Sequence, residues 1–189
     1  MACQRLLLGI TGATGMLYVP MLLDLLATAG VEVHGIVSEA GLQVLQFELG
    51  QKPEDLHQVS RWFDANDFTA APASGSALYD AMVVLPCTVG SLAAIAHGIC
   101  GNLLHRAADV TLKERRPLLL AVRETPLNRT HLRNMLAAHE AGAIICPPMP
   151  SFYQHPQTFN DLARQFAARI CDLLGVQVAA TTLHRWQGI

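Results

Sequence analysis

Residues 79–102, YDAMVVLPCTVGSLAAIAHGICGN, decide the fold. The apolar run at 81–85 has the length of a strand buried on both faces, and Pro86 is expected to end it because proline cannot donate to a ladder. The small residues 87–91 follow, and 92–99 predict an apolar helix. A strand that leads through such a turn into a helix N-terminus can bind an anion, since unpaired N–H groups and the helix dipole point the same way. The segment alone is equally consistent with an ordinary βα turn.

The same unit of strand, turn and helix recurs along the chain. Apolar runs of strand length occupy residues 5–10, 31–37, 81–85, 117–122 and 143–146. Helices are predicted at residues 16–29, 39–47, 92–99, 102–113, 128–139 and 158–174, with a further helix candidate at 53–62. This alternation is typical of an α/β fold: a Rossmann-like, doubly wound parallel sheet in three α/β/α layers. We expect a single domain over residues 1–189, with a tail at about 176–189 that packs on a neighbouring subunit.

Composition narrows the class of protein. Of the 189 residues, 51% are apolar, which is enough for one domain with a large core. Only 15% are charged, against roughly 25% in an average soluble domain. So few charged residues would leave much of a monomer's surface apolar, and we therefore expect an obligate oligomer. The net charge of −2 and the pI near 6.4 argue against nucleic acid or an anionic membrane as a partner.

The cysteines and the N-terminal residues indicate the compartment. Five cysteines, an odd number without CxxC spacing, are most simply explained by free thiols in a reducing cytoplasm. The apolar start of the chain is broken by Gly9, Gly12 and Gly15, so we do not interpret it as a signal peptide. No stretch approaches the ~18 apolar residues of a membrane span.

Polar side chains gather where the predicted strands end. Ligands of doubly wound sheets bind outside the carboxyl ends of the strands. Those ends here carry hydroxyls, backbone N–H groups, an arginine and a carboxylate, contributed by Thr14, Ser38, residues 88–91, Arg123, Glu124 and Tyr153. This set suits a ligand that carries a phosphate.

Other interpretations compete for the same residues. Glycines after the first strand also occur in dinucleotide-binding reductases, but those place an acidic residue where Ser38 stands, and no Tyr-x-x-x-Lys pair is present. The eight histidines show no HxH or HExxH spacing, so no metal site is expected. A packed, inert thiol is favoured for Cys87 over one with a lowered pKa. By composition alone, Lys113 and Arg169 are ordinary solvated cations, and Trp186 is explained equally well as a cap on a subunit contact.

Several motifs together resemble the flavin prenyltransferases of the UbiX type. They are GITGATG at 9–15, ASGS at 73–76, PCTVGSLAAIAHGICGNLLHRAADVTLKERRPLLLAVRETPL at 86–127, PPMPSFYQHP at 147–156 and RW at 185–186. The resemblance implies a metal-independent, homo-oligomeric flavoprotein, usually dodecameric. It implies an enzyme that joins the dimethylallyl group of dimethylallyl phosphate to N5 and C6 of reduced FMN. The product, prenylated FMN, would serve a partner decarboxylase.

The resemblance also assigns site residues, position by position. FMN would be bound by Gly12, Ala13, Thr14, Ser38, Thr88, Val89, Gly90, Ser91 and Arg123. The phosphate of the prenyl donor would be bound by Lys113, Tyr153 and Arg169, with neighbouring subunits contributing. The catalytic residues would be Glu48 and Glu124, which manage protons, and Trp186, which lines the prenyl pocket.

The chain departs from the family pattern at the proposed flavin site. Thr14 stands where the family usually has serine, residues 88–91 read Thr-Val-Gly-Ser in place of Ser-Met-Lys/Asn-Thr, and Gly101 replaces an aspartate. Two alternatives stay open. Gly90 and Gly101 motivate an FMN-binding paralogue that carries flavin without prenyl transfer. The other alternative is an FMN-dependent cysteine decarboxylase, a related class that shares the fold, although its Asn in the turn and its Met-Asn pair in the substrate loop are absent here.

Overall fold

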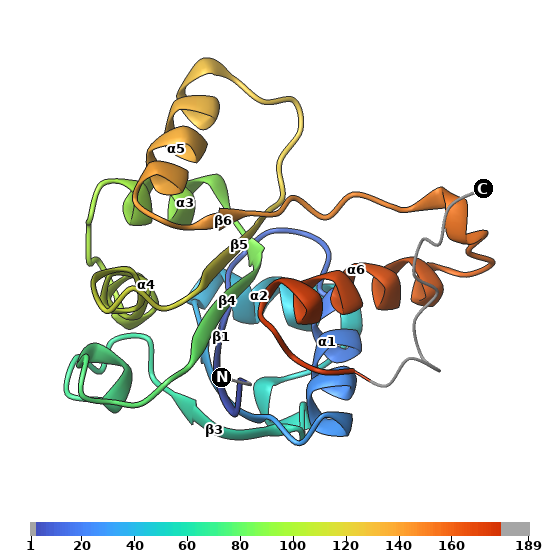
Figure 1. Cartoon of the computed structure of the whole chain (residues 1–189), viewed down its shortest axis with the longest axis horizontal. Helices are drawn as coiled ribbons and strands as arrows, with labels where there is room; N and C mark the ends of the chain where they lie inside the picture. The colour runs from blue at the N-terminus through green and yellow to red at the C-terminus, as the bar shows by residue number, and fades with distance from the viewer. Residues whose placement is uncertain (1–2, 179–189) are drawn as a thin grey trace.

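Six parallel strands form one sheet in the order β3-β2-β1-β4-β5-β6 (Figure 1). The computed structural model describes residues 3–178. The strands are β1 (Arg5–Ile10), β2 (Glu32–Val37), β3 (Val59–Phe63), β4 (Ala81–Cys87), β5 (Leu118–Val122) and β6 (Ile144–Ile145). The order runs outward in one direction from β1 to β3 and in the other from β4 to β6. The order in which strands are added to the sheet thus reverses between β1 and β4, which confirms the doubly wound parallel sheet.

Helices cover both faces of this sheet and complete the three layers (Figure 1). One face carries α1 (Tyr18–Thr28), α2 (Glu39–Leu49) and α6 (Phe159–Leu173), and the other carries α3 (Val89–Ala96), α4 (Leu103–Lys113) and α5 (Arg129–Glu140). Short 3₁₀ turns, η1 (Pro53–Asp55), η2 (Ala71–Ala73) and η3 (Phe152–Gln154), lie in the connections. No helix within residues 3–178 is long and apolar enough to cross a membrane.

Each central strand contributes to two hydrophobic cores because successive side chains point to opposite faces. In β1, Leu6 and Leu8 pack into the core beneath α1 and α6, whereas Leu7 packs into the core beneath α3 and α4. β4 divides in the same way, with Val83 in the first core and Val84 in the second. Burial on both faces explains why these strands are continuously apolar in sequence.

The helix candidate at residues 53–62 is wrong. The chain makes one 3₁₀ turn at Pro53–Asp55 and then forms the edge strand β3. The aromatic ring of Trp62 lies over Gly35 of the paired strand β2, where a Cβ would come within 2.3 Å of the ring. Pairing with β2 and this ring contact, both non-local, outweigh the local signal of a proline followed by acidic residues.

The expected end of the central strand at Pro86 is also wrong, because β4 continues to Cys87. The register of β4 against β5 shifts between Val84 and Cys87, so the pairing does not require an N–H group from Pro86. The Pro86 carbonyl oxygen accepts hydrogen bonds from Thr11 instead. The last strand is shorter than the 143–146 run, and α3 begins at Val89 rather than at Leu92.

The contact between α2 and β1 leaves no room for a side chain at Gly41. A Cβ there would lie 2.8 Å from the Ile10 carbonyl oxygen, which is backbone and cannot move aside cheaply. We expect Gly41→Ala to lower the free energy of unfolding by about 1–3 kcal/mol, measured by urea denaturation. The control is Gly90→Ala in α3, where the nearest atom would be 3.9 Å away. That variant should lose no stability, and an equal loss in both would contradict the packing explanation.

Candidate active site

The loops that follow β1 and β4 are joined by the side chain of Thr11. Its hydroxyl donates to the Pro86 carbonyl oxygen at 2.8 Å and accepts from the Thr88 N–H at 2.9 Å. Only 2% of Thr11 is exposed, so neither bond is exchanged for water. These two loops flank the point where the strand order reverses, which is where doubly wound sheets bind ligands. Sequence reasoning took the neighbouring residues 12–14 and missed Thr11, although a hydroxyl directly after a buried strand was a usable signal.

The loop after β1 passes close to α2. A Cβ at Gly12 would lie 2.4 Å from the Ala40 Cβ, so only glycine fits there. Thr14 is exposed at the tip of this loop. The Glu48 carboxylate, on α2, accepts hydrogen bonds from the N–H groups of Gly15 at 3.0 Å and Met16 at 2.8 Å. Glu48 therefore holds the end of the loop where α1 begins.

Ser38 stands at the carboxyl end of β2 and caps α2. Its hydroxyl oxygen accepts from the Gly41 N–H at 3.0 Å, and its own N–H donates to the Ile10 carbonyl oxygen at 2.9 Å. The hydroxyl proton is still available to a ligand, because the cap uses only the oxygen. An aspartate or glutamate at this position would instead repel a phosphate.

Thr88 caps α3 and orders the turn that the sequence singled out. Its hydroxyl oxygen accepts from the Ser91 N–H at 3.1 Å and donates to the Ser91 hydroxyl oxygen at 3.1 Å. Gly90 is exposed, and a Cβ there would come no closer than 3.9 Å to another atom, the Thr88 hydroxyl oxygen. The first turn of α3 thus reaches the surface at Gly90, and exposed first-turn N–H groups are what an anion site needs. Cys87 is fully buried, which confirms the expected packed thiol, and this burial raises the pKa of the thiol to about 12.

Arg123 and Glu124 reach the same edge from the end of β5. The Arg123 N–H donates to the Cys87 carbonyl oxygen at 2.9 Å, which ties β5 to β4 beside the α3 turn. Burial raises the pKa of the Tyr18 hydroxyl, and the nearby positive charge of Arg123 partly offsets that rise. Arg123 therefore lies near the start of α1, across β4 from its own strand. Glu124 is exposed, and its carboxylate accepts the Thr125 N–H at 2.9 Å.

Of the three residues expected to bind the donor phosphate, Lys113 lies at the opposite edge of the sheet from Arg169 within one chain. Arg169, on α6, lies near the end of β6, since its charge opposes the rise that burial causes in the pKa of Cys146. Tyr153 is half exposed in η3, at the end of a segment that runs away from the sheet (Figure 1). Lys113 ends α4, directly before β5, and so lies at the amino edge of the sheet. The length of β5, about 17 Å, separates Lys113 from Arg123.

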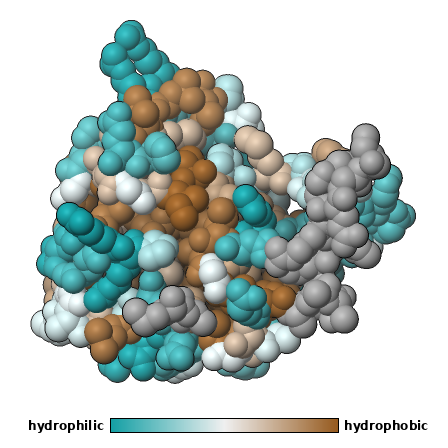
Figure 2. All heavy atoms as spheres, viewed as in Figure 1, coloured by the Kyte–Doolittle hydropathy of each residue, from teal (hydrophilic) through white to brown (hydrophobic). Residues whose placement is uncertain are grey.

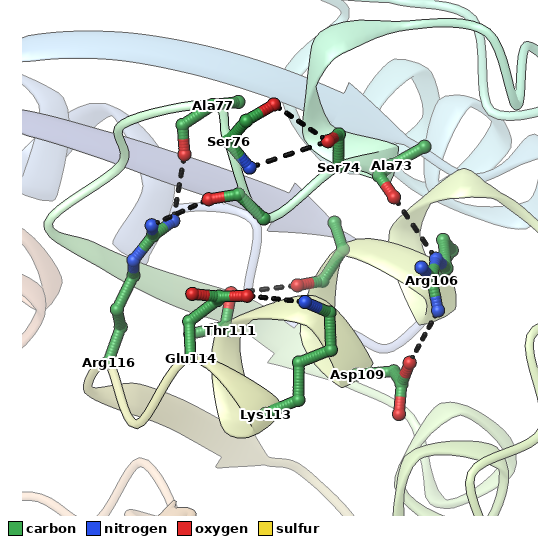
Figure 3. Close-up of polar contacts among 12 residues, drawn as sticks. Ala73, Ser74, Ser76, Ala77, Arg106, Asp109, Thr111, Lys113, Glu114 and Arg116 are labelled. Atoms are coloured by element: carbon green, nitrogen blue, oxygen red, sulfur yellow. Dashed lines mark hydrogen bonds and ion pairs between the residues drawn. The ribbon is translucent and has the colours of Figure 1, made fainter.

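Lys113 belongs to a second polar cluster, formed with the loop at residues 73–77 (Figure 3). It forms an ion pair with Glu114, and both side chains crowd Gly75. Arg106 donates to the Ala73 carbonyl oxygen at 3.1 Å, and Arg116 donates to the carbonyl oxygens of Gly75 and Ala77, both at 2.8 Å. The cluster is cationic, with the hydroxyls of Ser74 and Ser76 bonded to each other at 2.9 Å. Sequence reasoning quoted ASGS without assigning it a role and missed Arg106.

The structure thus brings all nine of the expected flavin residues to one edge of the sheet. That set comprises Gly12, Ala13, Thr14, Ser38, Thr88, Val89, Gly90, Ser91 and Arg123, with Glu48 and Glu124 beside them. Trp186 lies outside the described residues. Within residues 3–178, no group of three or more His, Cys, Asp or Glu side chains is arranged to hold a metal ion.

Comparisons with known proteins point to one family. The Flavoprotein family matches residues 1–172. Flavin prenyltransferase UbiX of Methanothermobacter thermautotrophicus is 42% identical over 98% of this chain and 96% of its own length. The crystal structure of AnUbiX (PadA1) in complex with FMN and dimethylallyl pyrophosphate has a TM-score of 0.94 and 38% identity, covering 99% of both chains. A dodecameric FMN-dependent UbiX-like decarboxylase from Escherichia coli O157:H7 has a TM-score of 0.92 and 38% identity, covering 98% of this chain and 100% of its own.

The Thr11 hydroxyl offers a direct test of how the two loops are joined. Thr11→Val removes it with little change of shape, leaving the Thr88 N–H without its acceptor. We expect a loss of about 1–3 kcal/mol in the free energy of unfolding, together with weaker FMN binding, measured by denaturation and by flavin fluorescence. Thr11→Ser keeps the hydroxyl and should retain most of both properties. If serine were no better than valine at this position, the hydroxyl would not be what joins the loops.

Proposed function

The chain belongs to the UbiX-type flavin prenyltransferases of the Flavoprotein family, and from this we propose how its own residues carry out the reaction. The enzyme joins a dimethylallyl group to N5 and C6 of reduced FMN, giving prenylated FMN for a partner decarboxylase. FMN is a substrate here, and it supplies both nucleophilic atoms. The observation that carries the proposal is the convergence of the Thr11-joined loops, Ser38 and Arg123 at the reversal point of the sheet.

The residues at this edge fit a flavin mononucleotide. The exposed turn at Gly90 offers first-turn N–H groups of α3, and Thr14, Ser38 and Ser91 add hydroxyls. Arg123 supplies a fixed positive charge beside them, which favours phosphate and the anionic form of reduced flavin. Serine at the end of β2, where dinucleotide-binding folds carry an acid, supports a phosphate over a ribose diol at that place.

Donor binding is proposed to need more than one subunit. Lys113, Tyr153 and Arg169 provide two cations and a phenol, the groups that stabilise a departing phosphate. As N5 bonds to the allylic carbon, the bond from that carbon to the phosphate oxygen breaks, and negative charge develops on the phosphate. Because Lys113 lies at the opposite edge from Arg169, the lysine of one subunit would complete the site of another. The second cluster would then bring Ser74 and Arg106 near the same phosphate.

The surface supports this assembly. Large apolar side chains are exposed on α5 and just before it, among them Leu127, Leu132 and Leu136, of which the last two are more than half exposed. Figure 2 shows hydrophobic atoms gathered over this helix. Patches of this kind mark subunit contacts. Together with the dodecameric relative, they support a homo-oligomer, and we propose a dodecamer.

The carboxylates and the tryptophan have different proposed roles. Glu124 is exposed at the flavin edge. There it can accept the proton that C6 loses after ring closure, a loss that restores the aromatic ring of the flavin. Glu48 already accepts two backbone N–H groups, which favours a part in holding the flavin loop over proton transfer. Trp186 remains proposed to line the prenyl pocket, and the tail at 176–189 to pack on a neighbouring subunit. Five free cysteines support the proposed cytoplasmic location.

Incubating the purified protein with dithionite-reduced FMN and dimethylallyl phosphate tests the function. We expect the extracted flavin to gain the mass of one isoprene unit, since the protein holds both substrates at one edge. Parallel reactions with the pyrophosphate compare the two donors. If the flavin stays bound but unchanged with both prenyl donors, prenyl transfer is contradicted and a flavin carrier is favoured. The missing side chains at Gly90 and Gly101 are the reason for considering a carrier. Release of CO2 from a peptide with a C-terminal cysteine would favour a decarboxylase.

Mixed oligomers test whether the donor site is shared. We expect Lys113→Ala and Arg169→Ala each to abolish most transfer, because each removes a cation from the phosphate. If the two residues come from different subunits, oligomers refolded from an equal mixture should regain roughly a quarter of parental transfer, by random assortment around a closed symmetric assembly. Lys52→Ala is the control for charge removal, because Lys52 belongs neither to the proposed flavin site nor to the second polar cluster around Lys113. Absence of any recovery in well-assembled mixtures would place both cations in one subunit.

A further inference from the structure

His105 lies beneath the α3 turn and contacts a hydroxyl of the proposed flavin site. Its Nε2 is 3.3 Å from the hydroxyl oxygen of Ser91, a residue that is only 8% exposed. The Nδ1 atom of the same ring is buried and has no hydrogen-bond partner among the described residues. The backbone N–H of His105 donates to the Asn102 side chain that caps α4, and this bond fixes the backbone from which the His105 ring extends.

These contacts determine which ring nitrogen carries the proton. Burial lowers the pKa of His105, so the ring is neutral near pH 7 and has a single N–H. A proton on Nδ1 would be a buried donor without an acceptor, and orphaned buried N–H groups are rarer than orphaned acceptors. A proton on Nε2 instead has the Ser91 oxygen as its partner. His105 therefore donates to Ser91.

The Ser91 oxygen then accepts two hydrogen bonds, one from Thr88 and one from His105. Both lone pairs are used, and only its own proton is left to bond. We propose that His105 is a positioning residue that makes the Ser91 hydroxyl a committed donor to an acceptor oxygen of bound FMN. This inference rests on the proposed flavin site, and it names a determinant of flavin affinity that acts through Ser91.

Gly101 leaves open the space beside the unpaired ring atom. A Cβ at Gly101 would lie 3.7 Å from Nδ1 of His105, with no closer neighbour. An acceptor placed there would bond a proton on Nδ1 and reverse the donor role of Nε2. The absence of a side chain at 101 is thus what allows His105 to donate to Ser91.

FMN affinity, measured by quenching of flavin fluorescence, tests the proposal in the full-length oligomer. We expect His105→Leu to weaken binding by up to about fivefold to tenfold, the order of one hydrogen bond, because the Ser91 hydroxyl is no longer committed to donating to FMN. His105→Gln keeps an N–H donor and should restore most of the affinity. In a Ser91→Ala background, His105→Leu should have no further effect. If the parent protein does not bind FMN, the proposed function is overturned. If the parent and the leucine variant bind FMN equally well, only this inference is overturned.

Substitutions at Gly101 test the direction of the bond even where His105→Leu does not fold. Gly101→Asp places a carboxylate beside Nδ1, and Gly101→Ala is the matched control without an acceptor. At a pH well above the ordinary histidine pKa of about 6.5, we expect the aspartate variant to bind FMN more weakly than the alanine variant. At a pH well below it, the doubly protonated ring donates again and the difference should shrink. Equal affinities of the two variants at both pH values would contradict the proposal, as would a glutamine variant no better than leucine.

Discussion

The hydrogen bonds of Thr11 are the constraint on which the proposed flavin site depends. One hydroxyl joins the ends of β1 and β4, two strands that lie side by side at the reversal point of the sheet. Helices leave these strands towards opposite faces, so without a link the two loops could separate. Once the loops are joined, the α3 turn, Ser38 at the end of β2 and Arg123 at the end of β5 lie at the same edge of the sheet.

The same geometry supports the proposed assembly of several subunits. In a parallel sheet each crossover helix returns the chain to the amino edge, so a cation at the end of α4 cannot reach a ligand at the carboxyl edge of its own chain. Lys113 occupies that position, whereas Arg169 lies near the end of β6. The proposed donor phosphate, which needs both cations, would therefore sit between subunits. The low charge content and the exposed leucines of α5 agree with a surface made for such contacts.

The strand order is shared with dinucleotide-binding proteins, so the fold alone does not choose the ligand. Individual side chains do. Ser38 replaces the acid that would bind a ribose, and the Thr88–Ser91–His105 hydrogen bonds orient hydroxyls where the turn carries no cation of its own. The departures at Gly90 and Gly101 thus remove side chains while the backbone N–H groups and hydroxyls that bind an anion are kept.

The order of strands and helices, the turn after β4 and the family itself followed from sequence, because apolar periodicity, caps and short motifs are local properties of the chain. The edge strand β3 was mistaken for a helix, since its stability comes from pairing with β2 and from Trp62 over Gly35. Likewise, no local pattern shows that Thr11 bonds to Pro86, 75 positions away, or that His105 reaches Ser91. The sequence by itself determined which residue types and motifs the chain carries, and from them the residues proposed to bind phosphate and flavin. Only the tertiary structure decided which of them meet, because that depends on strand neighbours and on the edge at which each helix ends.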